Sequence, residues 1–244
     1  MYPTLFRIGS FEITSFGAMV ALGALVGLWV LGRELARDRL PQNAIDAAIF
    51  GVFGGMAGAK LLWVFEHAGE APFVDLAFSR GGMSWFGGFV GGVGTAIVVL
   101  LVRRLPILPV IAAATPALAI GHAIGRVGCL LVGDDYGRPT TLPWGIAFPE
   151  GLPPTDVPVH PTQIYEALAL IPVAWILLAM RRRGAPPVRV LGAYLALAGS
   201  IRFAIEWLRI DVRVLGPLSV AHIASASVAV IGLGLLVRSR STAL

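Results

Sequence analysis

Segment 121–139 concentrates ionisable side chains directly after a run of leucine, isoleucine and alanine. It contains His122, Arg126, Asp134 and Asp135, with glycines between them. An ionisable side chain at bilayer depth costs roughly 2.5–3.5 kcal/mol on insertion scales unless it is paired or hydrated, so such residues usually mark a site. The planar guanidinium of arginine matches a phosphate through two parallel hydrogen bonds. These residue types therefore predict an anion-binding site that holds a phosphate group.

Two later segments carry polar residues of the same kinds. Arg202 and Glu206 are four residues apart, so on a helix they share a face and could pair with each other. Arg209 continues that face. Pro161 predicts the first position of another helix, with His160 at its cap. A histidine there could be a base, a phosphate ligand or only a capping side chain.

The composition identifies the elements that must position these residues. The chain has 244 residues, of which 57% are hydrophobic and 14% charged, and its mean hydropathy is +0.81. A soluble domain is about 25% charged, and a membrane-spanning helix needs about 20 mostly apolar residues. We therefore predict an all-α integral membrane protein with about seven transmembrane helices, over residues 14–32, 46–65, 84–102, 107–125, 162–180, 190–208 and 218–237.

The distribution of arginines predicts the direction of these helices. The arginines cluster in alternate connections. The clusters are Arg33, Arg37 and Arg39; Arg103 and Arg104; Arg181, Arg182, Arg183 and Arg189; and Arg238 and Arg240. Because cytoplasmic connections carry the excess of positive charge, we expect the N-terminus outside and the C-terminus in the cytoplasm. No basic patch interleaved with aromatic residues accompanies the net charge of +5, so we expect no nucleic-acid partner.

No long linker or internal repeat divides the chain, so we expect a single transmembrane domain over residues 1–244. Two outward-facing loops are long, 66–83 and 133–160. The first should carry a short amphipathic stretch, and the second, rich in proline and glycine, should be an ordered but irregular cap. The single Cys129 excludes an intrachain disulfide and a Cys-based zinc site. We expect it to fill space as an apolar residue, and we expect no cofactor or metal.

Three cations from different predicted helices share one depth in the membrane. At 1.5 Å per residue, Lys60 lies about 20 Å from the cytoplasmic end of its span, at the depth of Arg126 and Arg202. This concentration predicts an outward-facing cationic cavity in the outer half of the bilayer. A cavity open sideways to lipid favours a phospholipid headgroup as its anion. In one alternative, Asp134 or Asp135 folds back and pairs with Arg126.

Three motifs of the chain are specific: Gly125-Arg126-Val127-Gly128-Cys129 through Gly133-Asp134-Asp135-Tyr136-Gly137-Arg138, His160-Pro161-Thr162-Gln163-Ile164-Tyr165-Glu166 and Arg202-Phe203-Ala204-Ile205-Glu206-Trp207-Leu208-Arg209. With these motifs the sequence resembles the bacterial prolipoprotein diacylglyceryl transferases over nearly the whole chain. The segments 59–61, 82–88 and 218–222 also fall in the family's order. The resemblance implies transfer of the diacylglyceryl group of phosphatidylglycerol to the lipobox cysteine of a preprolipoprotein, which releases glycerol phosphate.

The same resemblance implies partners, location and site residues. The partners are membrane phosphatidylglycerol and the preprolipoprotein signal peptide, and the location is the bacterial inner membrane, with the active site towards the periplasmic leaflet. The catalytic residues implied are Arg126 and Arg202, which bind the phosphate and stabilise the leaving group, together with His160 and Asp134. The implied substrate-binding residues are Lys60, His122, Gly137, Tyr165, Glu166 and Glu206.

The chain departs from the family at two positions that bear on the base. Many members have a histidine or tyrosine where this chain has Phe86, and many have a tyrosine where it has Ala198. If the family's base is that histidine, this chain needs a replacement, for which His122, His160 and Asp134 are the candidates. Two alternatives follow: a non-catalytic phospholipid-binding or transport protein of the same fold, or a related transferase with a different acceptor.

Overall fold

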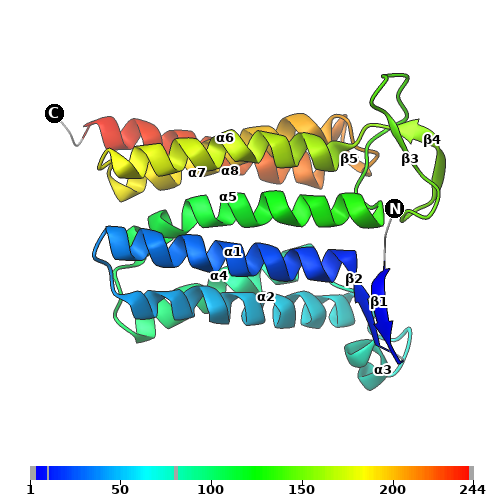
Figure 1. The fold of residues 1–244 in the computed structure, drawn as a ribbon, viewed down its shortest axis with the longest axis horizontal. Coiled ribbons are helices and arrows are strands. Elements are labelled where there is room, and N and C mark those ends of the chain that lie inside the picture. Colours follow the sequence, from blue (N-terminus) through cyan, green and yellow to red (C-terminus); the bar gives the residue numbers. More distant parts are fainter. Residues whose placement is uncertain (1–3, 10, 80–81, 242–244) are drawn as a thin grey trace. The chain divides into compact units, whose positions relative to one another are not determined.

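The computed structural model describes residues 4–9, 11–79 and 82–241, so residues 80–81 of the predicted loop 66–83 lie outside the described part (Figure 1). Within that part, seven helices are long and apolar enough to cross a membrane. They are α1 (Ser15–Arg37), α2 (Ile45–Glu66), α4 (Trp85–Val102), α5 (Ile107–Val132), α6 (Thr162–Arg182), α7 (Pro187–Glu206) and α8 (Val220–Ser241). The predicted helical fold with seven spans is confirmed, and the direction of the spans stays a prediction.

Helix α5 continues to Val132, past its predicted end at residue 125. Its glycines do not interrupt it, and it ends where Gly133 adopts a φ of +74°. The N–H groups of Gly133 and Asp134 both donate to the carbonyl of Cys129, at 2.9 and 3.1 Å, as in a glycine-terminated helix. Arg126 and Cys129 therefore lie on a regular helix, not in the loop that follows.

The described residues form two compact units, one of Leu31–Val110 and one of Met1–Val30 with Ile111–Leu244. The single-domain expectation stays a prediction. In the first unit, α2 packs against α4 through glycines. A Cβ at Gly58 would lie 2.4 Å from the carbonyl oxygen of Gly87, so only glycine allows this approach of the two backbones. The glycines of α2 and α4 therefore allow the two helices to pack closely.

The larger unit contains most of α1, most of α5, and α6 to α8 (Figure 1). Helices α7 and α8 approach closely, because a Cβ at Gly232 would lie 2.3 Å from the backbone nitrogen of Ala196. Helix α1 meets α5 where a Cβ at Gly23 would lie 2.9 Å from the carbonyl oxygen of Gly121. A buried apolar core joins α5, α6 and α7, and it includes Ala112, Ala119, Val173, Leu177 and Val190.

Short elements occupy the connections of the described part. Three antiparallel hairpins are present there: β1 (Thr4–Ile8) with β2 (Phe11–Thr14), β3 (Ile146–Phe148) with β4 (Thr155–Val159), and β5 (Arg213–Leu215) with β6 (Leu218–Ser219). A 3-10 turn, η1 (Gln42–Ala44), precedes α2, and a short helix, α3 (Phe73–Phe78), lies where a short amphipathic stretch was expected. The expectation of an irregular cap over 133–160 was wrong for β3 and β4, because proline is compatible with short edge strands that need no ladder N–H at that position.

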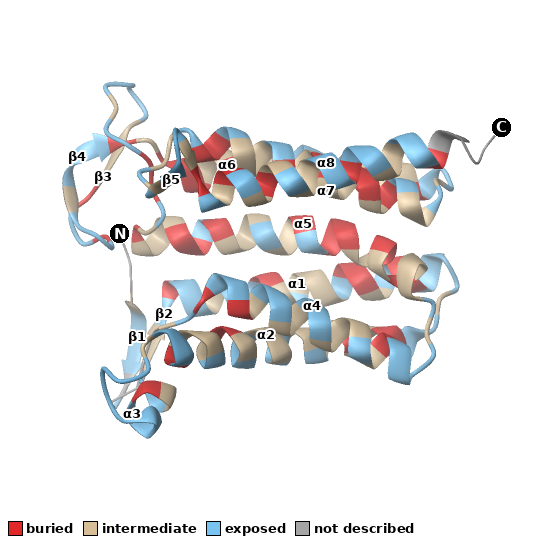
Figure 2. Ribbon diagram, turned by 180° about the vertical axis from the view of Figure 1, so that it is seen from behind, coloured by how far each residue is buried: buried red, intermediate tan, exposed pale blue. Residues whose placement is uncertain are grey.

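Large apolar side chains line the outside of the long helices. Figure 2 shows exposed residues along their whole length, and these include Leu25, Phe53, Val90, Trp175 and Val230, each more than 60% exposed. A soluble protein rarely presents large contiguous apolar surface. The exposed surface is therefore that of a protein solvated by lipid.

Candidate active site

Arg126 lies in α5 and contacts carboxylates from two other segments. Its Nη1 donates to Oδ2 of Asp135 at 2.8 Å, and its Nε lies 2.8 Å from Oε2 of Glu166 in α6. Arg126 is 8% exposed and Glu166 2%, so the guanidinium is held in one place by buried ion pairs. Of the alternative in which Asp134 or Asp135 folds back onto Arg126, the structure shows the pairing with Asp135. The second partner, Glu166, was assigned to substrate binding and not to Arg126.

Asp135 joins Arg126 to Arg209. Its φ of +61°, two residues after the left-handed Gly133, turns the chain back towards α5. Arg209 donates from Nη2 to Oδ1 of Asp135 at 2.7 Å and from Nη1 to its carbonyl oxygen at 2.6 Å. Burial alone would raise the pKa of Asp135, but the charges and hydrogen bonds of Arg209 and Arg126 outweigh it and lower that pKa to about 2. The carboxylate is therefore ionised at neutral pH.

Arg202 pairs with Glu206 one turn later in α7, as their spacing allows. The Nη2–Oε2 distance is 2.8 Å, and Nε of Arg209 lies 3.6 Å from the same oxygen. Glu206 is fully buried. The Nη1 atom of Arg202 is also buried and has no hydrogen-bond partner within the described residues. This N–H group is thus a donor that Arg202 can offer to a phosphate oxygen.

The prediction of a cavity with an excess of positive charge was wrong for these arginines. Each of them lies within ion-pair distance of carboxylates of the same unit, and the network comprises Arg126, Arg202, Arg209, Asp135, Glu166, Glu206 and Asp211. Position along a helix predicts the depth of an arginine but not the acids that a loop or a neighbouring helix brings to it. The arginines are therefore hydrogen-bond donors that neighbouring carboxylates hold in place.

The aspartates around Arg209 differ in their pKa values. Burial raises the pKa of Asp211, but hydrogen bonding and charge from Arg209 outweigh it, so that pKa lies below its ordinary value. Burial would lower the pKa of Arg209, but Asp211 and Asp135 raise it above its ordinary value. Burial also raises the pKa of Asp134, although Cys129 opposes this by hydrogen bonding. Asp134 therefore binds a proton more readily than Asp135 does.

The start of α6 is tied to the loop that carries both aspartates. The hydroxyl of Thr162 donates to the carbonyl oxygen of Asp135 at 2.7 Å, and the side-chain amide of Gln163 donates to the carbonyl oxygen of Asp134. Both side chains are fully buried. The helix begins at Thr162, the start of the predicted span, but Pro161 and not His160 is its cap residue. Sequence reasoning missed this role, although two polar residues in the first turn of a membrane helix could have indicated it.

His160 and Tyr165 contact each other beside this turn. The hydroxyl of Tyr165 lies 3.3 Å from Nδ1 of His160 and accepts a hydrogen bond from Nε1 of Trp144 at 2.7 Å. His122 lies elsewhere, on α5, where its Nε2 is 3.4 Å from Oε1 of Glu166. The structure therefore brings His122, but not His160, to the carboxylate that pairs with Arg126.

Gly137 and Cys129 both contribute to packing within the larger unit. A Cβ at Gly137 would lie 2.7 Å from the carbonyl oxygen of Leu208 and 2.9 Å from Cβ of His160, so this glycine permits close packing of the loop. Cys129 is buried, as expected for an apolar filler, and Nη1 of Arg126 lies 3.6 Å from its Sγ. Ala198 is partly buried in α7, one turn before Arg202.

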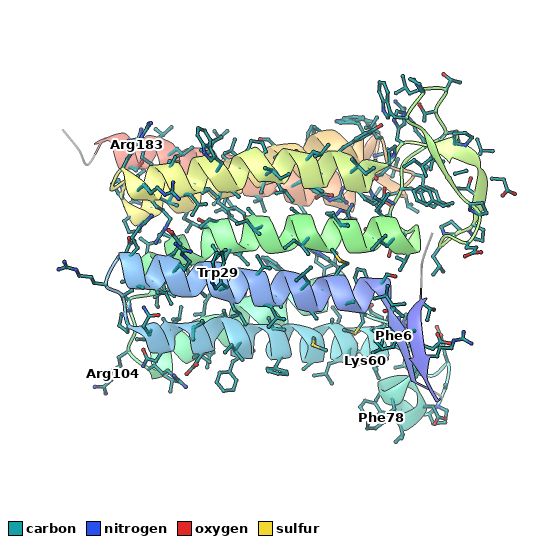
Figure 3. All side chains as sticks on the ribbon, viewed as in Figure 1. Phe6, Trp29, Lys60, Phe78, Arg104 and Arg183 are labelled. Atoms are coloured by element: carbon teal, nitrogen blue, oxygen red, sulfur yellow. The ribbon has the colours of Figure 1, made fainter. Side chains whose placement is uncertain are left out.

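Lys60 belongs to the other unit, Leu31–Val110. Figure 3 labels it on α2. Its Nζ donates to the carbonyl and to the hydroxyl of Ser79, at 3.0 and 2.9 Å, and lies 4.6 Å from the ring centroid of Trp63. Phe86, in the first turn of α4, packs edge-on against Trp85. A joint phosphate site of Lys60 with the arginines stays a prediction.

An apolar groove of about 550 Å³ lies between α5 and α6 in the larger unit. Arg126 and Gln163 are the polar members of its wall. The other lining residues are Ile120, Ala123, Ile124, Val127, Leu130, Ile164, Ala167, Leu168, Leu170, Ile171, Ala174, Trp175 and Leu178. On α6 the wall runs from residue 163 to residue 178, or about 22 Å at 1.5 Å per residue. The apolar wall of this groove suits the acyl chains of a lipid.

Comparison with known proteins gives one family over nearly the whole chain. The prolipoprotein diacylglyceryl transferase family matches residues 3–238. Three relatives named phosphatidylglycerol–prolipoprotein diacylglyceryl transferase come from Geobacter sulfurreducens, Clostridium tetani and Cereibacter sphaeroides. They are 32%, 31% and 32% identical to this chain over 96%, 87% and 96% of its length, and over 94%, 87% and 96% of their own. Because the match extends through all the spans, the chain belongs to the prolipoprotein diacylglyceryl transferase family.

Proposed function

We propose that this protein transfers the diacylglyceryl group of phosphatidylglycerol to the lipobox cysteine of a preprolipoprotein and releases glycerol phosphate. The observation that carries the proposal is an apolar groove between α5 and α6 with Arg126 in its wall. An anionic headgroup beside two acyl chains is the substrate chemistry that such a site fits. The family match over residues 3–238 supports the same reaction.

The reaction breaks one carbon–oxygen bond and forms one carbon–sulfur bond. The thiolate of the acceptor attacks the glycerol carbon that carries the phosphate ester, and the electron pair leaves on the phosphate oxygen. Charge grows there in the transition state, so preorganised donors aimed at it stabilise the transition state more than the ground state. Arg126 and the free Nη1 of Arg202 supply these donors, and Asp135 and Glu206 keep them in place.

The thiol proton must go to a base, because a free cysteine has a pKa of about 8.5. Among the candidates His122, His160 and Asp134, the geometry favours Asp134. Its Oδ1 is buried without a hydrogen-bond partner among the described residues, and burial raises its pKa. A carboxylate with a raised pKa accepts a proton more readily. Asp134 also follows α5 directly and lies close to Arg126, next to Asp135.

Turnover by the purified protein tests the reaction. The protein is incubated with phosphatidylglycerol and a lipobox peptide, and both glycerol phosphate release and the mass of the peptide are measured. We expect a peptide heavier by one diacylglyceryl group. Arg126→Lys should lower kcat about 100-fold, since lysine lacks the bidentate fork. Arg183→Lys, at the exposed end of α6, is the matched control and should turn over as the wild type does.

The outcomes separate the proposed function from its alternatives. Phosphatidylglycerol binding without a peptide mass change would support a non-catalytic lipid-binding protein, the alternative that Phe86 raises. Glycerol phosphate release with an unmodified peptide would indicate a different acceptor. Equal activity of the Arg126→Lys and Arg183→Lys variants would contradict the role of Arg126. Thermal unfolding in detergent verifies that both variants are folded.

The pH dependence of kcat/KM tests the assignment of the base. With Asp134 as base, wild-type kcat/KM falls as the pH drops through the raised pKa of this carboxyl, because the protonated form cannot accept the thiol proton. Asp134→Asn should lower kcat/KM and remove this acidic limb, whereas His160→Gln should keep the limb. Loss of the limb in His160→Gln with its retention in Asp134→Asn would assign the base to His160 instead.

We also propose that the site faces the periplasmic leaflet of the bacterial inner membrane. The support is the alternation of arginine-rich connections with connections that hold most of the acids. The loop of Asp134 and Asp135 is one of the latter. Phosphatidylglycerol would then enter sideways from the bilayer, and the signal peptide from the membrane or the periplasm.

A further inference from the structure

Ser219 and His222 form a buried polar pair that contacts the arginine network at Glu206. Ser219 ends β6, and His222 lies in the first turn of α8. Ser219 is 2% exposed and His222 fully buried. None of the roles proposed above uses either residue. Buried polar side chains on a membrane helix are costly unless they are satisfied, so their contacts indicate what they are for.

The two residues cap α8 reciprocally. The backbone N–H of His222 donates to Oγ of Ser219 at 3.2 Å, and the backbone N–H of Ser219 donates to Nδ1 of His222 at 3.2 Å. A capping box has this arrangement, with glutamate or glutamine in the position that His222 takes here. The box fixes the direction of the Ser219 side chain before any other contact is considered.

The hydroxyl proton of Ser219 goes to Glu206. The Oγ–Oε1 distance is 2.5 Å, and Oγ also lies 3.0 Å from Nδ1 of His222. That nitrogen already accepts the backbone N–H of Ser219 and faces Nη1 of Arg213 at 3.1 Å. An arginine N–H can only donate, so Nδ1 is an acceptor that is already in use. The carboxylate of Glu206 is the remaining acceptor for the hydroxyl.

Glu206 transmits this contact to Arg202. Its Oε1 accepts from Ser219, and its Oε2 lies 2.8 Å from Nη2 of Arg202. Glu206 is fully buried, so a carboxylate without the Ser219 hydrogen bond would have one unsatisfied oxygen and freedom to rotate. Rotation of the carboxylate would move the guanidinium of Arg202 and its free Nη1.

We propose that Ser219 and His222 are positioning residues for Arg202 and act through Glu206. This inference rests on the proposed function, in which Arg202 stabilises the departing phosphate. The alternative is that the pair serves only to cap α8. A capping residue is worth about 1 kcal/mol of stability, and that role would leave catalysis unchanged in any variant that keeps the cap.

Two substitutions at Ser219 separate the two roles. Threonine and glycine are about equally good at the N-cap position, but only threonine has a hydroxyl. Ser219→Gly therefore leaves the capping stability close to that of Ser219→Thr, although the N–H of His222 loses its Oγ acceptor. It removes the donor to Glu206, whereas Ser219→Thr keeps both contacts. We expect kcat of Ser219→Gly to fall about 10- to 100-fold, the loss of one hydrogen bond to a charged group. Its KM for phosphatidylglycerol should be unchanged, and Ser219→Thr should restore most of kcat.

A second measurement reports on Arg202 without turnover. Phenylglyoxal modifies accessible guanidinium groups, and mass spectrometry gives the rate at Arg202, whose side chain is 29% exposed. We expect faster modification of Arg202 in Ser219→Gly than in Ser219→Thr. Equal rates in the two folded variants would overturn the inference whether or not the protein is a transferase.

Failure of the proposed function and failure of this inference would give different experimental results. A wild-type protein that releases no glycerol phosphate contradicts the proposed function, and the modification rates then decide the inference alone. An active wild type with equal kcat in Ser219→Gly and Ser219→Thr overturns the inference and leaves the transferase function intact. A matched pair at His222 gives the same contrast: His222→Gln completes a standard capping box and should retain more activity than His222→Leu, which leaves the N–H of Ser219 without its acceptor.

Discussion

Asp134 and Asp135 are adjacent in the chain, yet the structure gives them different environments. Asp135 bridges Arg126 and Arg209, which lowers its pKa to about 2. Asp134 lies near Cys129 and has a raised pKa. One carboxylate is therefore a permanent anion that orients arginines, and the other can exchange a proton. Pairs of titratable groups with opposite shifts commonly divide structural and acid–base roles in this way.

Protonation of Asp135 should destabilise the protein at low pH. Its pKa of about 2 lies below the ordinary value of 3.8, so its stabilisation is complete above pH 3.8 and is lost as the pH falls through 2. We expect the thermal unfolding midpoint in detergent to fall between these pH values, and to fall less in Asp135→Asn. Asp156→Asn, in an exposed part of the same loop, should keep the wild-type pH dependence. Identical curves for all three proteins would contradict the ion-pair role of Asp135.

At the scale of elements, close helix packing and an open groove occur in different places. Helices α2 and α4 approach through glycines until their backbones touch, whereas α5 and α6 leave an apolar groove of about 550 Å³. The first arrangement relies on van der Waals contact, since apolar burial drives little helix association within lipid. The second leaves room for a lipid chain between two helices.

A methyl group at the α2–α4 contact should destabilise the first unit. A Cβ at Gly58 would lie 2.4 Å from a carbonyl oxygen, whereas a Cβ at Gly94 of α4 meets nothing within 4 Å. We expect Gly58→Ala to cost about 1–3 kcal/mol through overpacking. Gly94→Ala should be neutral or slightly stabilising, because alanine is the better helix former. The measurement is thermal unfolding in detergent, and equal midpoints for the two variants would refute the packing described here.

A bulky residue in the α5–α6 groove should weaken lipid binding. Ala167→Phe fills part of the groove, and Ala169→Phe, on the same helix but outside the groove wall, is its matched control. Displacing two CH₂ groups at about 0.8 kcal/mol each raises KM for phosphatidylglycerol about tenfold. Shorter acyl chains should reduce the difference between the variants. A KM that rises equally in both would place the acyl chains elsewhere.

At the scale of the whole molecule, charge in the connections predicts which side of the membrane each loop occupies. Arginines concentrate at and just after the C-terminal ends of α1, α4, α6 and α8, and acids concentrate in the other connections. Cytoplasmic connections retain positive charge during insertion. The loop that carries Asp134 and Asp135 would therefore lie outside, with the end of α6 inside.

Cysteine labelling in intact cells tests this orientation. In a Cys129→Ser background, Asp156→Cys should react with a membrane-impermeant maleimide if the loop 133–160 faces outside, as its charge predicts. Arg183→Cys, at the end of α6, should react only after the cells are permeabilised. Both positions are exposed, so access through the membrane decides the result. The reverse pattern would invert the orientation and place the site on the cytoplasmic side.

Much of the fold could be predicted from the sequence, and less of the site. The bounds of the spans were predicted within five residues apart from the end of α5, where Gly133 and not Gly125 stops the helix. The pairing of Arg202 with Glu206 followed from helical spacing. The pairing of Arg126 with Glu166 did not, because it depends on how α5 and α6 face each other. The short hairpins were missed because two to four pairs of residues leave little pattern in a sequence.

By itself the sequence determined the seven spans, the polar residues that they carry and the family, because a helix in lipid must satisfy its backbone internally and therefore needs a continuous apolar run. Only the tertiary structure decided which acid meets which arginine. Asp134 and Asp135 are the same residue type one position apart, and the left-handed turn after α5 directs one towards Arg126 and Arg209. The chain reverses direction at this turn, so the residues that meet there are decided by their distance in space. Their separation along the sequence does not predict that distance.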